Sequence, residues 1–197
     1  MRQKFEQNNG INRREEIIKT AAQIFSAKGY HGTTLDEIAK QIGVSKPALY
    51  YHIKNKEEIL KEIVGRIMEP MESVAQVGKS DMPPRERISE MIRMLIQFAA
   101  ERQEITLIAL ELNKILPKRT REALKKRQKD VEDVLMQTLE QGMKEGVFKS
   151  GDSKMYAFAI LAAANSVYRW YNPEGKLTHN QIAEQFIRLL ELGYIKE

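Results

Sequence analysis

The sequence predicts an all-α protein, and three observations support that prediction. Apolar residues recur three and four positions apart along most of the 197-residue chain, which is the spacing of one helix face. N-capping residues precede several of these stretches, and glycines follow several of them. No segment alternates apolar and polar residues as a half-buried strand does. We therefore expect helices throughout.

The first helix is expected to begin at Asn12, which together with Glu15 has the spacing of a capping box. Its buried stripe consists of Ile17, Ala21, Ile24 and Phe25. Gly29 follows the last turn, and a glycine at this place ends a helix because it tolerates the left-handed backbone conformation.

Two short helices follow and form a helix-turn-helix pattern. Thr34 and Glu37 form a second capping box, and Gly43 ends the helix that they begin. Ser45 then caps a short helix with Pro47 in its first turn. That helix is too short and too polar to serve packing alone, so we interpret the pair as a motif that lies in a DNA major groove. The alternative is an ordinary helical hairpin whose polar residues face water.

The rest of the chain predicts a larger helical part, so we expect two domains, residues 1–54 and 55–197. The first helix of the second domain is expected to kink or break near Glu69, because Pro70 lacks a backbone donor and clashes with the preceding turn. Further helices are expected at about 85–101, 104–116, 118–144, 153–171 and 178–192.

The last two of these helices predict a surface for self-association. The segment from Met155 to Val167 is almost continuously apolar, and such a helix must be covered on more than one face. A two-fold symmetric partner would complete a four-helix interface. The residues expected in this dimer interface are Ala163, Val167, Ile182, Phe186, Leu189 and Leu190.

Composition narrows the classes of function. The chain has no cysteine, which excludes disulfides, thiolate metal sites and cysteine nucleophiles. No His, Asp and Glu spacing suggests a metal, and we expect neither a metal nor a cofactor. The net charge is +5, and residues 1–65 contain 11 Lys and Arg against 8 Asp and Glu, which mildly favours a polyanionic partner. No signal peptide and no apolar run of about 20 residues is present, so we expect a cytoplasmic protein without a membrane span.

The segment from Gly32 to Glu57, with its run LYYHIKNK, closely resembles the TetR family of bacterial transcriptional regulators. The run QGMKEGVF and the two apolar terminal helices resemble the ligand-binding, dimerising part of that family. The resemblance therefore extends over the whole chain. It implies a homodimeric repressor that binds a palindromic operator and is released when a small molecule binds the C-terminal domain.

The resemblance also implies a set of DNA contacts. The residues that it places near base edges are Lys46, Pro47, Ala48 and Tyr50, and those near phosphates are Thr33, Tyr51, His52 and Lys56. Thr34, Ser45 and Lys54 complete the expected set. A lysine suits guanine acceptors, and hydroxyls, a ring nitrogen and helix N-termini all donate to phosphate. For Tyr50 the alternative is a ring packed in the small core, since its neighbours Leu49 and Ile53 are apolar.

The stretch from Asn165 to Gly175 resembles the branch of the family that responds to acyl-coenzyme A thioesters, such as repressors of fatty-acid, aromatic-acid or steroid degradation. Members of that branch often have Trp after the Asn, whereas this chain has Ser166, and a smaller side chain would widen or redirect a pocket. Asn165 and Arg169 are polar residues in an apolar helix, which a ligand or a second subunit would have to satisfy.

The expected ligand-binding set adds apolar pocket walls and one cation to these residues. The full set is Phe98, Leu112, Arg127, Met136, Leu139, Phe158, Ala162, Asn165, Ser166, Arg169 and Trp170. Arg127 belongs to a basic stretch from Lys114 to Lys129 that suits the phosphates of coenzyme A. The alternatives are that the apolar members are ordinary core and that the basic stretch is a solvated helix face.

Two other classes of function are open at this point. An enzyme acting on acyl thioesters would need a nucleophile or base in the C-terminal domain, where His179 is the one histidine, and we expect no such activity. An architectural DNA-binding protein would use backbone charge without sequence choice and would prefer no palindrome.

Overall fold

The structure is a computed structural model that describes residues 2–103 and 116–194, with side chains described for residues 13–25, 27–103 and 116–191. The described part is helical and contains no β-strand, which confirms the predicted all-α class. Leu112 and nearly all of the helix expected at 104–116 lie outside the described residues. No helix within the described ranges is long and apolar enough to cross a membrane.

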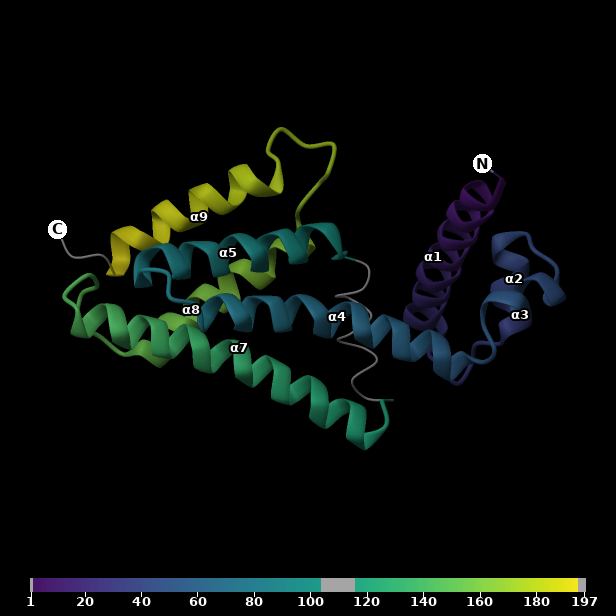
Figure 1. The fold of residues 1–197 in the computed structure, drawn as a ribbon, viewed down its shortest axis with the longest axis horizontal. Helices are drawn as coiled ribbons and strands as arrows, with labels where there is room; N and C mark the ends of the chain where they lie inside the picture. The colour runs from purple at the N-terminus through teal and green to yellow at the C-terminus, as the bar shows by residue number, and fades with distance from the viewer. Residues whose placement is uncertain (1, 104–115, 195–197) are drawn as a thin grey trace. The chain divides into compact units, whose positions relative to one another are not determined.

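The chain divides into two compact units. The N-terminal unit contains α1 (Arg2–Lys28), α2 (Leu35–Ile42), α3 (Lys46–His52), the part of α4 (Lys56–Gly78) up to Ile67, and the beginning of α7 up to Arg121. In it, α1 contacts both α2 and α3, and α2 contacts α3 (Figure 1). Fully buried side chains of this unit include Ile17, Ile18, Phe25, Ile38, Leu49 and Ile53.

The C-terminal unit contains the rest of α4, α5 (Pro84–Glu101), most of α7 (Lys118–Lys144), α8 (Ser153–Ser166), the 3-10 turn η1 (Val167–Arg169) and α9 (His179–Tyr194). Figure 1 shows α5 running beside α8 and α9, and α5 contacts both of them and η1. One apolar cluster joins all five helices, and its members include Val74, Ile92, Leu135, Ala157 and Ile187.

The start of α1 differs from the prediction. The helix begins at Arg2, so Asn12 lies inside it and the capping box predicted at Asn12 and Glu15 is wrong. Once the downstream turns have formed, each added residue gains a helical hydrogen bond. Because residues 2–12 contain no proline, nothing in this segment forces an end to the helix.

Two further helix boundaries also differ. Of the kink or break predicted near Glu69, the break is wrong, since α4 continues through Pro70. Proline removes one helical hydrogen bond, but Val74 and Ala75 in the next turn are buried, and their packing stabilises the helix. The helix expected at 153–171 ends at Ser166 and tightens into η1, and Pro173 disfavours helical backbone at Asn172, the residue before it, so no helix resumes there.

Candidate nucleic-acid interface

Side-chain caps fix both helices of the helix-turn-helix. Thr34 Oγ1 accepts a hydrogen bond from Glu37 N–H (3.2 Å), and Ser45 Oγ accepts one from Ala48 N–H (3.3 Å). Between them Gly43 has φ 74°, a conformation that is strained for residues with a Cβ. These features confirm the predicted caps and turn.

The recognition helix α3 has one buried and one exposed face. Leu49 is fully buried, and Ile53 at its end is buried too. The exposed side chains are Lys46, Pro47, Ala48, Tyr50 and Tyr51. Tyr50 is 44% exposed and Tyr51 is 86% exposed, so Tyr50 does not take the core position, which Leu49 fills. The helix therefore presents one basic, two apolar and two aromatic side chains to solvent.

Three of the expected DNA contacts already have intramolecular partners, namely Lys46, Thr34 and Ser45. The ammonium of Lys46 lies 2.9 Å from Asp36 Oδ2 in the first turn of α2, and the two hydroxyls serve as caps. The hydrogen bond to Asp36 raises the pKa of Lys46. The N-terminal turns of α2 and α3 thus lie close together.

Two residues expected to hold phosphates are engaged elsewhere. Thr33 is fully buried, and its hydroxyl donates to Gly29 O (2.9 Å). Lys56 Nζ donates to Tyr30 O (2.8 Å) and Thr33 O (2.6 Å), and it lies 4.7 Å from the centre of the Tyr30 ring. Both side chains therefore hold the loop between α1 and α2, and we withdraw Thr33 and Lys56 from the set of phosphate contacts.

His52 and Lys54 lie at the C-terminal end of α3. The side chain of Lys54 is exposed, while its backbone N–H donates to Glu58 Oε2 (2.8 Å). The half-buried His52 ring packs edge-on against Tyr51 with ring centres 5.1 Å apart. These three side chains extend the exposed surface of α3 towards the start of α4.

Arg14 joins three helices of this unit, and sequence reasoning missed it. Its guanidinium donates to His52 O at the end of α3, to Glu58 Oε1 (2.7 Å) and to Glu62 Oε1 (2.7 Å from Nε) on α4. The bond from Arg14 lowers the pKa of Glu58. A signal was present in the sequence: Arg14 precedes Ile18 by four residues on the buried stripe of α1, where a charged side chain must find partners.

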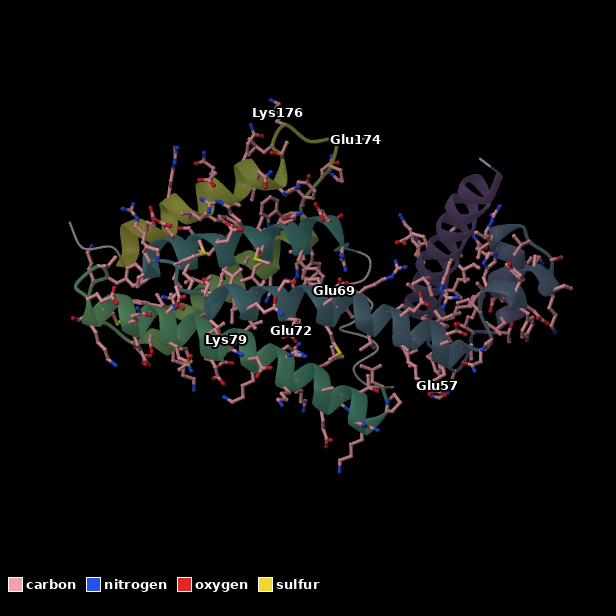
Figure 2. All side chains as sticks on the ribbon, viewed as in Figure 1. Glu57, Glu69, Glu72, Lys79, Glu174 and Lys176 are labelled. Atoms are coloured by element: carbon pink, nitrogen blue, oxygen red, sulfur yellow. The ribbon has the colours of Figure 1, made fainter. Side chains whose placement is uncertain are left out.

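The residues expected to bind an effector do not share one environment. Leu139 is fully buried in the core. The partly buried members are Phe98, Arg127, Met136 and Ser166, and the exposed members are Phe158, Ala162, Asn165, Arg169 and Trp170. Arg127 pairs with Glu72 of α4, which Figure 2 labels, and lies 3.7 Å from Asp130. Ser166 Oγ donates to Ala163 O (2.7 Å), so the Ser166 hydroxyl is already hydrogen-bonded within its own helix.

Helix α8 explains part of this division. It buries Ala157, Ile160 and Ala164 against the C-terminal core, and Phe158 and Ala162 lie on its other side. In the single chain these two residues face solvent and are not walls of an interior pocket. The almost continuously apolar sequence gave no indication of which face of α8 points inward.

The expected dimer residues divide in the same way. Val167 and Ile182 are buried in the core of their own chain, so they are inaccessible to a second chain and we withdraw them from the interface. Ala163, Phe186 and Leu190 are partly buried, and Leu189 is 65% exposed. The large apolar side chains that α8 does expose are Met155 (59% exposed) and Phe158 (41% exposed). Sequence reasoning missed Met155, although it lies three residues before Phe158.

Two family models match the chain. Residues 17–63 match the model for bacterial regulatory proteins of the tetR family, and residues 81–194 match the model for the tetracyclin repressor-like C-terminal domain. The first match contains the helix-turn-helix, and the second contains α5, α7, α8 and α9. The two matches together span both units.

Known relatives agree with these matches over nearly the whole chain. The uncharacterized HTH-type transcriptional regulator YhgD of Bacillus subtilis is 27% identical over 188 residues, which cover 94% of this chain and 96% of YhgD. The structure of the ketosteroid transcriptional regulator KstR2 of Mycobacterium tuberculosis superposes with a TM-score of 0.81 at 25% identity, covering 94% of this chain and 96% of that one. The structure of AibR in complex with isovaleryl coenzyme A and operator DNA has a TM-score of 0.69 at 30% identity, covering 90% of this chain and 97% of that one.

The sequence-specific regulators in this set exclude the architectural alternative. The chain belongs to the TetR family of bacterial transcriptional regulators.

Proposed function

We propose that this protein is a homodimeric repressor that binds a palindromic operator and is released by an acyl-coenzyme A thioester. The observation that carries the proposal is the exposed face of α3, a helix whose start is capped by Ser45. The side chains that project from this face are Lys46, Pro47, Ala48, Tyr50 and Tyr51. A short helix of this kind enters a major groove, and two copies related by symmetry read two half-sites.

The contacts that we propose follow from the side chains on that face. Lys46 and Tyr50 carry donors that suit base edges, and Pro47 and Ala48 suit a thymine methyl group. Phosphate contacts are assigned to the remaining members of the exposed surface, which are Tyr51, His52 and Lys54, together with the helix N-termini at Thr34 and Ser45. The capping hydroxyls leave further N–H groups of these first turns to donate to a phosphate.

A second copy of the chain is the proposed partner of the exposed side of α8. Met155, Phe158 and Ala162 lie at helical spacing on that side, so they form one apolar stripe. Leu189 adds an exposed apolar side chain from α9, which contacts α8. Two such pairs of helices packed about a two-fold axis would make a four-helix interface.

The effector is proposed from the relatives and from the polar residues near the end of α8. AibR is described in complex with isovaleryl coenzyme A, and KstR2 is a ketosteroid regulator. Asn165 and Arg169 are exposed and supply an amide and a guanidinium that suit a phosphate or a thioester oxygen. Arg127 would have to exchange Glu72 and Asp130 for such a ligand.

We propose further that the chain acts without catalysis and in the cytoplasm, where bacterial operator DNA is found. The absence of cysteine and the regulators among its relatives support the first point. Residues 1–54 would read DNA, and residues 55–197 would bind the effector and the second subunit.

Operator binding with and without effector tests this function. An operator duplex chosen from a random pool is titrated with protein alone and with isovaleryl, hexanoyl or palmitoyl coenzyme A. A coupling of about 1–3 kcal/mol predicts that one thioester lowers operator affinity roughly 5- to 150-fold, while free coenzyme A has less effect. Unchanged affinity at saturating concentration of every thioester would remove this class of effector.

A further inference from the structure

An ion pair between the first turns of α2 and α3 occupies the lysine that is expected to read a base. Asp36 Oδ2 lies 2.9 Å from Lys46 Nζ, and the two side chains are 61% and 58% exposed. The pair therefore lies at the surface of the helix-turn-helix. DNA that approaches α3 meets the Asp36 carboxylate together with the Lys46 ammonium.

The same arrangement recurs at several other cations of the N-terminal unit. Lys28 pairs with Glu37 across the α1–α2 loop, and Lys61 pairs with Glu57, which Figure 2 labels (3.1 Å). Further pairs are Arg13–Glu16, Arg14–Glu58 and Arg66–Glu15. The carboxylates therefore offset part of the positive charge that these paired cations offer to phosphates.

Non-specific DNA binding depends almost entirely on phosphate neutralisation, whereas specific binding adds base contacts. An exposed Lys–Asp pair favours the paired state over the separated one by no more than about fivefold in the equilibrium constant. A lysine contact to guanine acceptors discriminates between bases by about fivefold to 150-fold. A contact with the correct base therefore stabilises Lys46 more than its pair with Asp36 does. At a wrong base Lys46 stays paired with Asp36.

We propose that Asp36 is a specificity-determining residue, which retains Lys46 on non-operator DNA and gives it up at the operator. The proposal rests on the proposed function, in which α3 reads base edges. In non-specific complexes Lys46 then contributes no phosphate contact, and the Asp36 carboxylate faces the DNA backbone. Both effects lower affinity for random DNA more than affinity for the operator.

The test compares Asp36→Asn with wild-type protein on two duplexes of equal length, the selected operator and a scrambled sequence, between 50 and 200 mM salt. Asp133→Asn is the matched control, because it breaks another exposed Lys–Asp pair (Lys129–Asp133, 3.2 Å) with the same change of charge. One additional phosphate contact steepens the salt slope by about 0.9. For Asp36→Asn we expect this steepening on scrambled DNA, so that the gain in its affinity is about threefold larger at 50 mM than at 200 mM salt. Operator affinity changes less, so the ratio of the two affinities falls.

Three results would overturn the inference. The first is a ratio of operator to scrambled-DNA affinity in Asp36→Asn that equals that of wild type. The second is an equal fall of this ratio in Asp133→Asn. The third is a gain on scrambled DNA that persists in the double variant Asp36→Asn with Lys46→Met. The last result would show that Lys46 is not the released cation. A wild-type protein that prefers no operator at all would refute the proposed function itself, whereas an intact preference with an unchanged ratio would refute the role of Asp36 alone.

Discussion

Arg87 donates from Nη1 to Gly78 O (3.2 Å) and thereby caps the C-terminal end of α4 from the first turns of α5. The same guanidinium donates to Met82 O (3.1 Å) and to Gln141 Oε1 of α7 (2.9 Å), and only 8% of the residue is exposed. A cation at this place also opposes the negative end of the helix dipole. One side chain thus ties α4, α5 and α7 together inside the C-terminal unit.

Replacing Arg87 by Met is expected to lower the free energy of unfolding by about 2–4 kcal/mol, because three oxygens lose their donor and the bond to Gly78 O is buried. Arg93→Met is the matched control on the same helix. Arg93 is 40% exposed and pairs with Glu90 and Glu184, so its loss should cost no more than about 1 kcal/mol. Urea unfolding followed by circular dichroism measures both. Equal losses in the two variants would contradict the role given to Arg87.

Two glycines of α4 are expected to respond oppositely to alanine. A Cβ on Gly78 would lie 2.5 Å from Val134 Cβ, so Gly78→Ala forces α4 and α7 apart and should cost about 1–3 kcal/mol. A Cβ on Gly65 meets no atom within 4 Å, and Gly65→Ala should stabilise the helix by about 0.5–1 kcal/mol. Thermal unfolding of the two variants gives the signs, and a gain for Gly78→Ala would disprove the close approach.

Lys54 and Lys56 are expected to separate DNA contact from loop support. Lys56→Met removes two hydrogen bonds to the carbonyls of Tyr30 and Thr33, so it should lower stability by about 1–3 kcal/mol. Lys54→Met should leave stability nearly unchanged and reduce the salt slope of operator binding by about one unit, as the loss of a phosphate contact does. Melting temperatures and salt titrations of operator binding are measured for both variants. If Lys56→Met were as stable as wild type and reduced the salt slope by about one unit, Lys56 would be a phosphate contact and not a support of the loop.

The pairing of Arg14 with Glu58 is expected to make stability depend on acid pH. The hydrogen bond from Arg14 holds the pKa of Glu58 below its ordinary value of 4.5. A carboxylate with a lowered pKa stabilises the folded state above the ordinary value, and this contribution is lost as pH falls through the lowered one. Arg14→Met should therefore melt below wild type at pH 7, and the difference should shrink between about pH 5 and pH 3.

Arg13→Met is the control for that experiment, because Arg13 forms an exposed pair with Glu16 (side chains 45% and 49% exposed) on the same helix. Its melting temperature should stay close to that of wild type across the whole pH range. A constant difference between Arg14→Met and wild type from pH 7 to pH 3 would show that the carboxylates do not take part.

Local signals allowed the helix-turn-helix to be predicted, and long-range packing decided what the sequence could not show. The caps at Thr34 and Ser45 and the turn at Gly43 each depend on residues within four positions, so the sequence contains all that determines them. The continuation of α4 through Pro70 depends on the burial of Val74 and Ala75, which is a tertiary effect. The same holds for the α8 and α9 residues assigned to the dimer interface. Periodicity identifies an apolar stripe, but only the packed fold shows which of its residues lie in the core of the chain and which remain exposed for a partner.

Selection of duplexes from a random pool by the purified full-length protein tests the central claim most directly. Two recognition helices fixed by a two-fold axis predict enrichment of an inverted repeat, with half-site centres about 10 base pairs or a multiple of that distance apart. Protein mass on the enriched duplex, measured by light scattering, should correspond to an even number of chains. Enrichment of no sequence, or of a single unrepeated site bound by one chain, would contradict the account.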